Sequence, residues 1–144
     1  MSAQPPVAAP QTEVMPQTPT SRAKKILFVE DDESLASVYV TRLETEGFDV
    51  KRVPNGEDAL AAAIAFRPDL VLLDVMMPKI SGFDVLDILR NTPETANIKI
   101  IMLTALSQDS DKARAQSMGV DDYLVKSQVV IADVVNHIKQ HLGM

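Results

Sequence analysis

The stretch that most constrains the fold is a short apolar run that ends on a carboxylate, at residues 69–78 (DLVLLDVMMP). Its four central residues, 70–73, are all apolar, and prolines stand on both sides at Pro68 and Pro78. Such a run is typical of a strand that is covered on both faces, as in a parallel sheet. Asp74 directly follows this strand. Because ligands collect outside the carboxyl ends of strands in open α/β sheets, Asp74 is a candidate functional residue.

Four further apolar segments alternate with segments of helical pattern. Strands are predicted at residues 25–29, 48–53, 98–103 and 122–125, and helices at residues 34–46, 57–66, 107–118 and 128–142, with one more helix opening at residues 81–82 and ending before Pro93. Strands that alternate with helices form right-handed βαβ units. We therefore predict an α/β fold of the (βα)5 type, a three-layer sandwich around a five-stranded parallel sheet, with the more polar segment 48–53 as an edge strand.

The spacing of apolar residues also predicts which helix faces point into the core. Leu35, Val38 and Leu43 are expected to face inward in the first helix, and Leu60 and Ile64 in the second. The helix at 107–118 is polar on nearly all sides. A helix with so little apolar surface to bury is a candidate mobile element.

The ends of the chain differ in composition. Residues 1–22 hold five of the nine prolines and only two charged side chains, so we predict a disordered tail followed by one domain at residues 23–144. The tail has no charged start followed by an apolar stretch, and no segment approaches a membrane span, which together predict a cytoplasmic protein. The absence of cysteine excludes disulfides and thiolate chemistry, and the net charge of -6 argues against binding to nucleic acid.

Polar groups follow four of the predicted strands: Glu30 and Asp31, Asp74, Thr104 and Lys126. All strands of a parallel sheet end at the same edge, so these side chains are expected to gather there. Carboxylates repel one another unless a cation is present, and hard oxygen ligands suit Mg²⁺. A carboxylate nucleophile, a metal, an ammonium and a hydroxyl are the parts of a site that receives a phosphoryl group.

Each of these groups has a plainer interpretation by itself. Asp32 and Glu33 are favourable acids at a helix start, and the pair at 30–31 fits a solvated helix start as well. Thr104 alone is an ordinary strand or loop residue, and Lys126 alone is a surface charge. Four complementary groups at four strand ends are much harder to assign to chance.

The motifs at 26–32 (ILFVEDD), 69–78, 81–82 (SG), 101–105 (IMLTA) and 122–126 (DYLVK) occur in order and at sensible spacing. With them the chain resembles the receiver domain of two-component response regulators, of the single-domain, stand-alone type, from Lys24 to Leu142. The resemblance implies the flavodoxin-like strand order 2-1-3-4-5.

The resemblance also implies a role for each position. Asp74 would accept a phosphoryl group from the histidine of a sensor kinase. Asp31, Asp74 and the backbone carbonyl of Met76 would hold Mg²⁺, with Glu30 acting through a metal-bound water. Lys126 would pair with the phosphoryl oxygens. Thr104 would be both a site residue and a switch residue, because it would move to the phosphoryl group.

A change of the Tyr123 rotamer would accompany the movement of Thr104 and alter an output face made of the fourth helix, the fifth strand and the fifth helix. That face would regulate a partner protein. The chain would not be an enzyme for an outside metabolite; it would catalyse only its own phosphorylation and dephosphorylation. The implied partners are a sensor histidine kinase or phosphotransfer protein and a downstream target, with no direct nucleic acid, no membrane insertion, and a monomer or a weak homodimer through the output face.

One position departs from the family pattern. The family usually has proline after the lysine, often with a cis peptide bond, whereas this chain has Ser127. A cis bond without proline costs roughly 3 kcal/mol. The geometry of the peptide between Lys126 and Ser127 is therefore left open by the sequence.

Two other functions compete with this interpretation. A receiver-like module could signal without phosphorylation, but the intact set of Asp31, Asp74, Thr104 and Lys126 argues against it. An unrelated α/β enzyme is the other alternative. An aspartyl phosphohydrolase would need a paired-Asp motif after its first strand. At the same place, a nucleotide-binding protein would need a Gly-rich loop, and a flavodoxin would need a hydroxyl-rich loop that binds phosphate. Residues 30–33 (EDDE) fit none of these three patterns.

Overall fold

The computed structural model describes residues 22–144 and contains five strands and five α-helices in alternation. All of the predicted disordered tail except its last residue lies outside the described residues. The strands are β1 (Lys25–Val29), β2 (Asp49–Val53), β3 (Leu70–Leu73), β4 (Lys99–Thr104) and β5 (Asp122–Val125). The helices are α1 (Glu33–Thr45), α2 (Ala59–Phe66), α3 (Gly82–Arg90), α4 (Asp109–Ser117) and α5 (Ile131–His141).

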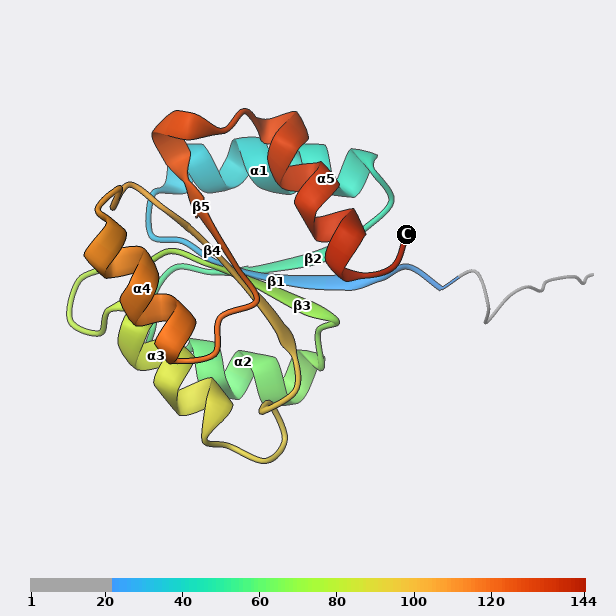
Figure 1. The fold of residues 1–144 in the computed structure, drawn as a ribbon. Helices are drawn as coiled ribbons and strands as arrows, with labels where there is room; N and C mark the ends of the chain where they lie inside the picture. Colours follow the sequence, from blue (N-terminus) through green and yellow to red (C-terminus); the bar gives the residue numbers. More distant parts are fainter. Residues whose placement is uncertain (1–21) are drawn as a thin grey trace, which may run out of the picture.

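The strands form one sheet in the order β2-β1-β3-β4-β5, and every neighbouring pair is parallel. Helices α1 and α5 cover one face of the sheet, and α2, α3 and α4 cover the other (Figure 1). The predicted fold class, a flavodoxin-like (βα)5 sandwich of three layers, is confirmed. The predicted edge position of the polar second strand is also confirmed, since β2 pairs only with β1.

The core consists of two clusters, one on each face of the sheet. In β1, Leu27 and Val29 pack toward α2, α3 and α4, whereas Ile26 and Phe28 pack toward α1 and α5. These four side chains are fully buried, as are all four residues of β3. A continuous apolar run is therefore the pattern of a central strand with helices on both sides.

The predicted inward faces of the first two helices are partly wrong. Val38 of α1 is 60% exposed, and Ile64 of α2 is 41% exposed. Leu43 is buried as predicted, but the other buried residues are ones that the prediction did not name: Ala36 and Tyr39 in α1, and Ala59, Ala62 and Ala63 in α2. The buried face of α2 consists of alanines alone, and the larger Ile64 beside them is left exposed to solvent.

Local signals at helix ends agree with the sequence. The Asp32 carboxylate accepts a hydrogen bond from the Leu35 amide at 3.0 Å and caps α1. Helix α4 buries only Ala115, so its predicted weak anchoring is confirmed. The described residues contain no cis peptide bond, and the chain passes from β5 into a 3₁₀ helix at Lys126–Gln128. No helix in this part of the chain is long and apolar enough to cross a membrane.

Candidate functional site

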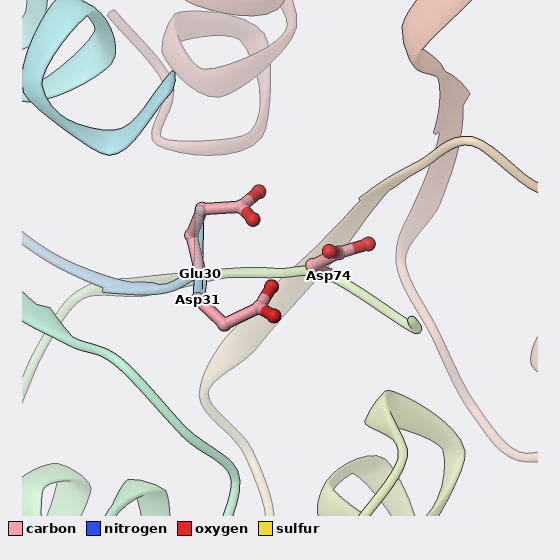
Figure 2. Close-up of side chains that lie close together, drawn as sticks. All are labelled: Glu30, Asp31 and Asp74. Atoms are coloured by element: carbon pink, nitrogen blue, oxygen red, sulfur yellow. The ribbon is translucent and has the colours of Figure 1, made fainter. Parts of the chain in front are cut away.

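The carboxyl ends of β1 and β3 bring three acidic side chains together. Glu30 and Asp31 follow β1, Asp74 follows β3, and one oxygen of each carboxylate lies within 4.8 Å of the others (Figure 2). Glu30 and Asp74 are buried, and Asp31 is exposed. The gathering of these strand ends follows from the parallel pairing of β1 with β3.

Lys126 enters the same cluster from the end of β5. Its Nζ donates a hydrogen bond to Glu30 Oε1 at 2.9 Å and lies 3.5 Å from Asp74 Oδ2. Its side chain is only 25% exposed. The lysine therefore pairs more closely with Glu30 than with the candidate acceptor, a detail that the sequence did not predict.

Two opposing effects set the pKa values in the cluster: burial, which disfavours the charged forms, and the ion pairs, which favour them. Burial raises the pKa of Asp74 and the pKa of Glu30, and Lys126 opposes the rise in both. Burial by itself would lower the pKa of Lys126, but the hydrogen bond to Glu30 and the charge of Asp74 outweigh it and raise that pKa. The lysine is thus held in its charged form.

The residues fit a divalent cation. Lys126 pairs with two of the three carboxylates, so the cluster keeps an excess of negative charge, and two of its members, Glu30 and Asp74, are buried. Buried charges need compensation, and a hard cation with oxygen ligands supplies it. The donor set, all oxygen, matches Mg²⁺ rather than a metal that prefers sulfur or imidazole.

Thr104 and Tyr123 meet at one backbone segment beside the cluster. Thr104 is fully buried at the end of β4, and its Oγ1 accepts a hydrogen bond from the Leu106 amide at 3.3 Å. Tyr123 is buried on β5, and its hydroxyl donates to the Leu106 carbonyl at 2.9 Å. Both predicted switch residues therefore hold the loop that leads into α4.

Met76 lies two residues past Asp74, and its amide donates to Asp74 Oδ1 at 3.3 Å.

Sequence reasoning missed Arg52. This residue lies on β2, and its Nε and Nη2 both donate to the Glu30 carbonyl oxygen, at 3.0 and 2.8 Å. The guanidinium thus clamps the turn that carries the acidic pair. An arginine on a polar edge strand carries no motif, and only the pairing of β2 with β1 reveals its position.

Gly82 has a steric role that its motif did not reveal. Its amide donates to the Val75 carbonyl at 2.8 Å. A Cβ at this position would overlap the carbonyl oxygen of Asp74 and lie 2.6 Å from Val75 Cα. The backbone that carries Asp74 therefore packs directly against the start of α3, where only glycine fits.

Comparisons with known proteins agree with this arrangement. The family model described as "Response regulator receiver domain" matches residues 26–139. Among solved structures, the BeF3-activated N-terminal receiver domain of Klebsiella pneumoniae RstA has a TM-score of 0.78 and 31% identity, covering 84% of this chain and 100% of that one. The chemotaxis protein CheY4 of Vibrio cholerae has a TM-score of 0.77 and 26% identity, covering 83% of this chain and 98% of that one.

The curated relatives correct the expected partners. The chain is 41% identical to the "DNA-binding dual master transcriptional regulator RpaA" of Synechocystis sp. and 42% identical to the phosphate regulon transcriptional regulatory protein PhoB of Rhizobium meliloti, in each case over 71% of this chain. The match spans less than half of their length, 42% and 45%. The exclusion of nucleic acid as a partner is therefore wrong. The net charge of -6 does not support that exclusion, because the charge of these 144 residues does not determine which ligands are bound by a longer protein that contains such a domain.

The strand order, the acidic cluster and the family match point to the same conclusion. The family model covers nearly all of the described residues, from β1 to the last turns of α5. The chain belongs to the receiver domains of two-component response regulators.

Proposed function

We propose that the chain is a phosphorylation-controlled switch in which Asp74 accepts a phosphoryl group from the histidine of a sensor kinase or of a phosphotransfer protein. The observation that carries this proposal is the buried pairing of Asp74 with Lys126, 3.5 Å apart, beside the carboxylates of Glu30 and Asp31. A nucleophilic carboxylate needs a neighbouring cation that favours its ionised form, and Lys126 is that cation. Receivers of this family typically act in the cytoplasm, and we propose the same compartment here.

The proposed chemistry is a transfer between two nucleophiles. An Asp74 carboxylate oxygen attacks the phosphorus of the phosphohistidine, a P–O bond forms and the P–N bond breaks. The electron pair of that bond stays on the imidazole nitrogen, and Asp74 becomes an acyl phosphate. Lys126 remains protonated and pairs with the phosphoryl oxygens, which its raised pKa favours.

Asp31, Asp74 and the backbone carbonyl of Met76 would hold Mg²⁺, with Glu30 acting through a metal-bound water. When bound, the ion neutralises charge on the transferring group. The chain acts on no outside metabolite in this proposal, and it catalyses only its own phosphorylation and the later hydrolysis of the acyl phosphate.

Acetyl phosphate with Mg²⁺ is expected to add one phosphoryl group to the wild-type chain and none to Asp74→Asn. The amide cannot form an acyl phosphate, because it lacks the nucleophilic carboxylate oxygen. Intact-mass spectrometry detects the adduct directly, and a time course after removal of acetyl phosphate follows its hydrolysis. A chelator control should abolish adduct formation in the wild type.

Asp69→Asn is the matched control, because Asp69 is an exposed aspartate at the opposite end of the same strand. This variant should accept the phosphoryl group as the wild type does. An adduct on Asp74→Asn would overturn the assignment of the acceptor. No adduct on the wild type, with Mg²⁺ binding demonstrated, would favour a module that signals without phosphorylation.

We further propose that Thr104 and Tyr123 transmit the phosphoryl state to α4, β5 and α5. Both residues hold Leu106 at the entrance of the weakly anchored α4. The Thr104 hydroxyl accepts a hydrogen bond from the Leu106 amide, and a phosphoryl group on Asp74 would offer it an acceptor for its own proton, which would draw the side chain toward Asp74. Differential contacts of this kind shift a two-state equilibrium.

Amide hydrogen exchange in residues 104–126 is therefore expected to change when BeF3⁻, a phosphoryl mimic, binds the wild-type chain with Mg²⁺. Exchange in β2, at the far edge of the sheet, serves as the internal reference and should stay unchanged. Thr104→Val keeps the shape of the side chain but removes the hydroxyl, and it should abolish the change. Identical exchange in residues 104–126 with and without the mimic would contradict the proposed switch.

A further inference from the structure

Arg52 holds the peptide group that immediately precedes a candidate metal ligand. Its Nε and Nη2 donate to the Glu30 carbonyl oxygen at 3.0 and 2.8 Å, and this carbonyl belongs to the peptide unit that joins Glu30 to Asp31. A peptide unit is planar, so the orientation of the carbonyl also sets the direction in which the chain enters Asp31. We propose that Arg52 is a positioning residue for the Mg²⁺ site, which orients Asp31 through the backbone.

The Asp31 carboxylate depends on its backbone for its position. Its two neighbours differ from it in this respect: Glu30 Oε2 accepts a hydrogen bond from the Asp32 amide at 3.1 Å, and Asp32 Oδ1 accepts one from the Leu35 amide at 3.0 Å. Asp31 is exposed, and no described residue forms such a bond with its carboxylate. The direction of this side chain therefore follows from how the turn at residues 30–32 is held.

The second strand holds this turn at two points. The Glu30 amide donates to the Val53 carbonyl at 3.1 Å, which continues the pairing of β1 with β2 by one residue. The Glu30 carbonyl is held by the side chain of Arg52, which is half-buried. A guanidinium is planar and presents its donors in a rigid fork, so two donors on one oxygen restrict the orientation of the peptide as well as its distance.

Charge and positioning make opposite predictions for metal binding. A guanidinium near a cation site repels the ion, so by charge alone the removal of Arg52 would strengthen Mg²⁺ binding. Outer groups that orient a metal ligand have the other effect, and their loss typically weakens metal affinity about 10- to 100-fold. The sign of the change in Mg²⁺ affinity therefore distinguishes a positioning role from a purely electrostatic one.

Calorimetric titration of Mg²⁺ into the full chain, with no phosphoryl donor present, tests this role. Arg52→Met keeps a long unbranched side chain but loses the charge and both donors, and it should bind Mg²⁺ about tenfold more weakly than the wild type. Arg52→Lys keeps the charge and a donor and should recover part of the affinity. Lys51→Met removes an exposed charge from the adjacent position of β2 and should bind Mg²⁺ at least as tightly as the wild type.

Two further measurements separate positioning from a general loss of structure. In the metal-free chain, amide hydrogen exchange at residues 30–32 should be faster in Arg52→Met than in the wild type, whereas exchange in α5 should be unchanged. Phosphorylation by acetyl phosphate should be slower in this variant at limiting Mg²⁺ and should return to the wild-type rate at saturating Mg²⁺. Arg52 acts on the affinity for the ion and not on the transfer step, because its hydrogen bonds go to the Glu30 backbone.

This inference rests on the Mg²⁺ site of the proposed function, but the titration involves no phosphoryl group, so the two can fail separately. Mg²⁺ affinity in Arg52→Met that equals or exceeds that of the wild type would overturn the role of Arg52 and leave Asp74 as the proposed acceptor. A lower phosphorylation rate that persists at saturating Mg²⁺ would also overturn it. Absence of Mg²⁺ binding to the wild type would overturn both the metal site and this role.

Discussion

Replacing Gly82 with alanine is expected to lower the free energy of unfolding by about 2–3 kcal/mol and to slow phosphorylation of Asp74. The new Cβ would overlap the Asp74 carbonyl oxygen and approach Val75 Cα to 2.6 Å, so backbone rather than a flexible side chain must move. Overpacking of this kind typically costs 1–3 kcal/mol. Displacement of a reacting group by about 1 Å slows a reaction by up to roughly a hundredfold. Urea unfolding and the rate of adduct formation measure the two effects.

Gly47→Ala is the matched control for this prediction. A Cβ at Gly47 meets no atom within 4 Å, but the residue has a φ of +95°, which L-amino acids adopt at a cost. This variant should lose roughly 1–2 kcal/mol of stability and phosphorylate at the wild-type rate. Wild-type phosphorylation kinetics in Gly82→Ala would show that the close approach does not position Asp74.

Replacing Lys126 with methionine is expected to destabilise the protein by about 2–3 kcal/mol at pH 8 in the absence of Mg²⁺. The substitution leaves the buried carboxylates of Glu30 and Asp74 without their ammonium. Removal of one partner from a buried ion pair costs roughly 3–5 kcal/mol, and the partial exposure of Lys126 reduces that figure. Lys51→Met removes an exposed lysine from β2 and should change stability by less than about 0.5 kcal/mol.

The loss of stability caused by Lys126→Met, relative to the wild type, should become smaller as the pH falls. Burial already raises the folded-state pKa of Asp74 above 3.8 and that of Glu30 above 4.5, and loss of the ammonium raises both further. The folded variant then binds protons more tightly than the unfolded chain. Its relative stability is therefore lowest above the folded pKa values and recovers as the pH falls through them.

Urea unfolding of Lys126→Met and of the wild type at pH 8 and pH 5 tests whether the difference in stability between them decreases at the lower pH. The double variant Lys126→Met/Asp74→Asn should be more stable than Lys126→Met at pH 8, because one of the unpaired charges is gone. An equal loss at both pH values, with no rescue by Asp74→Asn, would mean that Lys126 stabilises the fold by packing and not by charge.

The alternation of strands and helices was predictable from the sequence because it depends on short-range patterns. Continuous apolar runs such as residues 70–73 mark central strands, and glycine, proline and capping residues mark helix ends. The gathering of Glu30, Asp31, Asp74 and Lys126 was also predictable, although these residues are far apart in the chain. Parallel strands end at one edge of the sheet, so position in the chain already indicates proximity there.

The tertiary structure alone decided how side chains pair across elements. The clamp of Arg52 on the Glu30 carbonyl depends on the register of β2 against β1, and the closer pairing of Lys126 with Glu30 than with Asp74 depends on side-chain length and rotamer. The hydrogen bonds of His137 and His141 with Asp122 depend on how α5 packs over β5.

The sequence by itself thus determined the fold class and the edge of the sheet at which the acidic site forms, because apolar periodicity and chain connectivity are local properties. It did not determine that Val38 and Ile64 lie outside the core, or that Gly82 packs against the Asp74 carbonyl. These features depend on distances of a few ångströms between elements that are separate in sequence. Packing sets such distances only once all the layers are assembled.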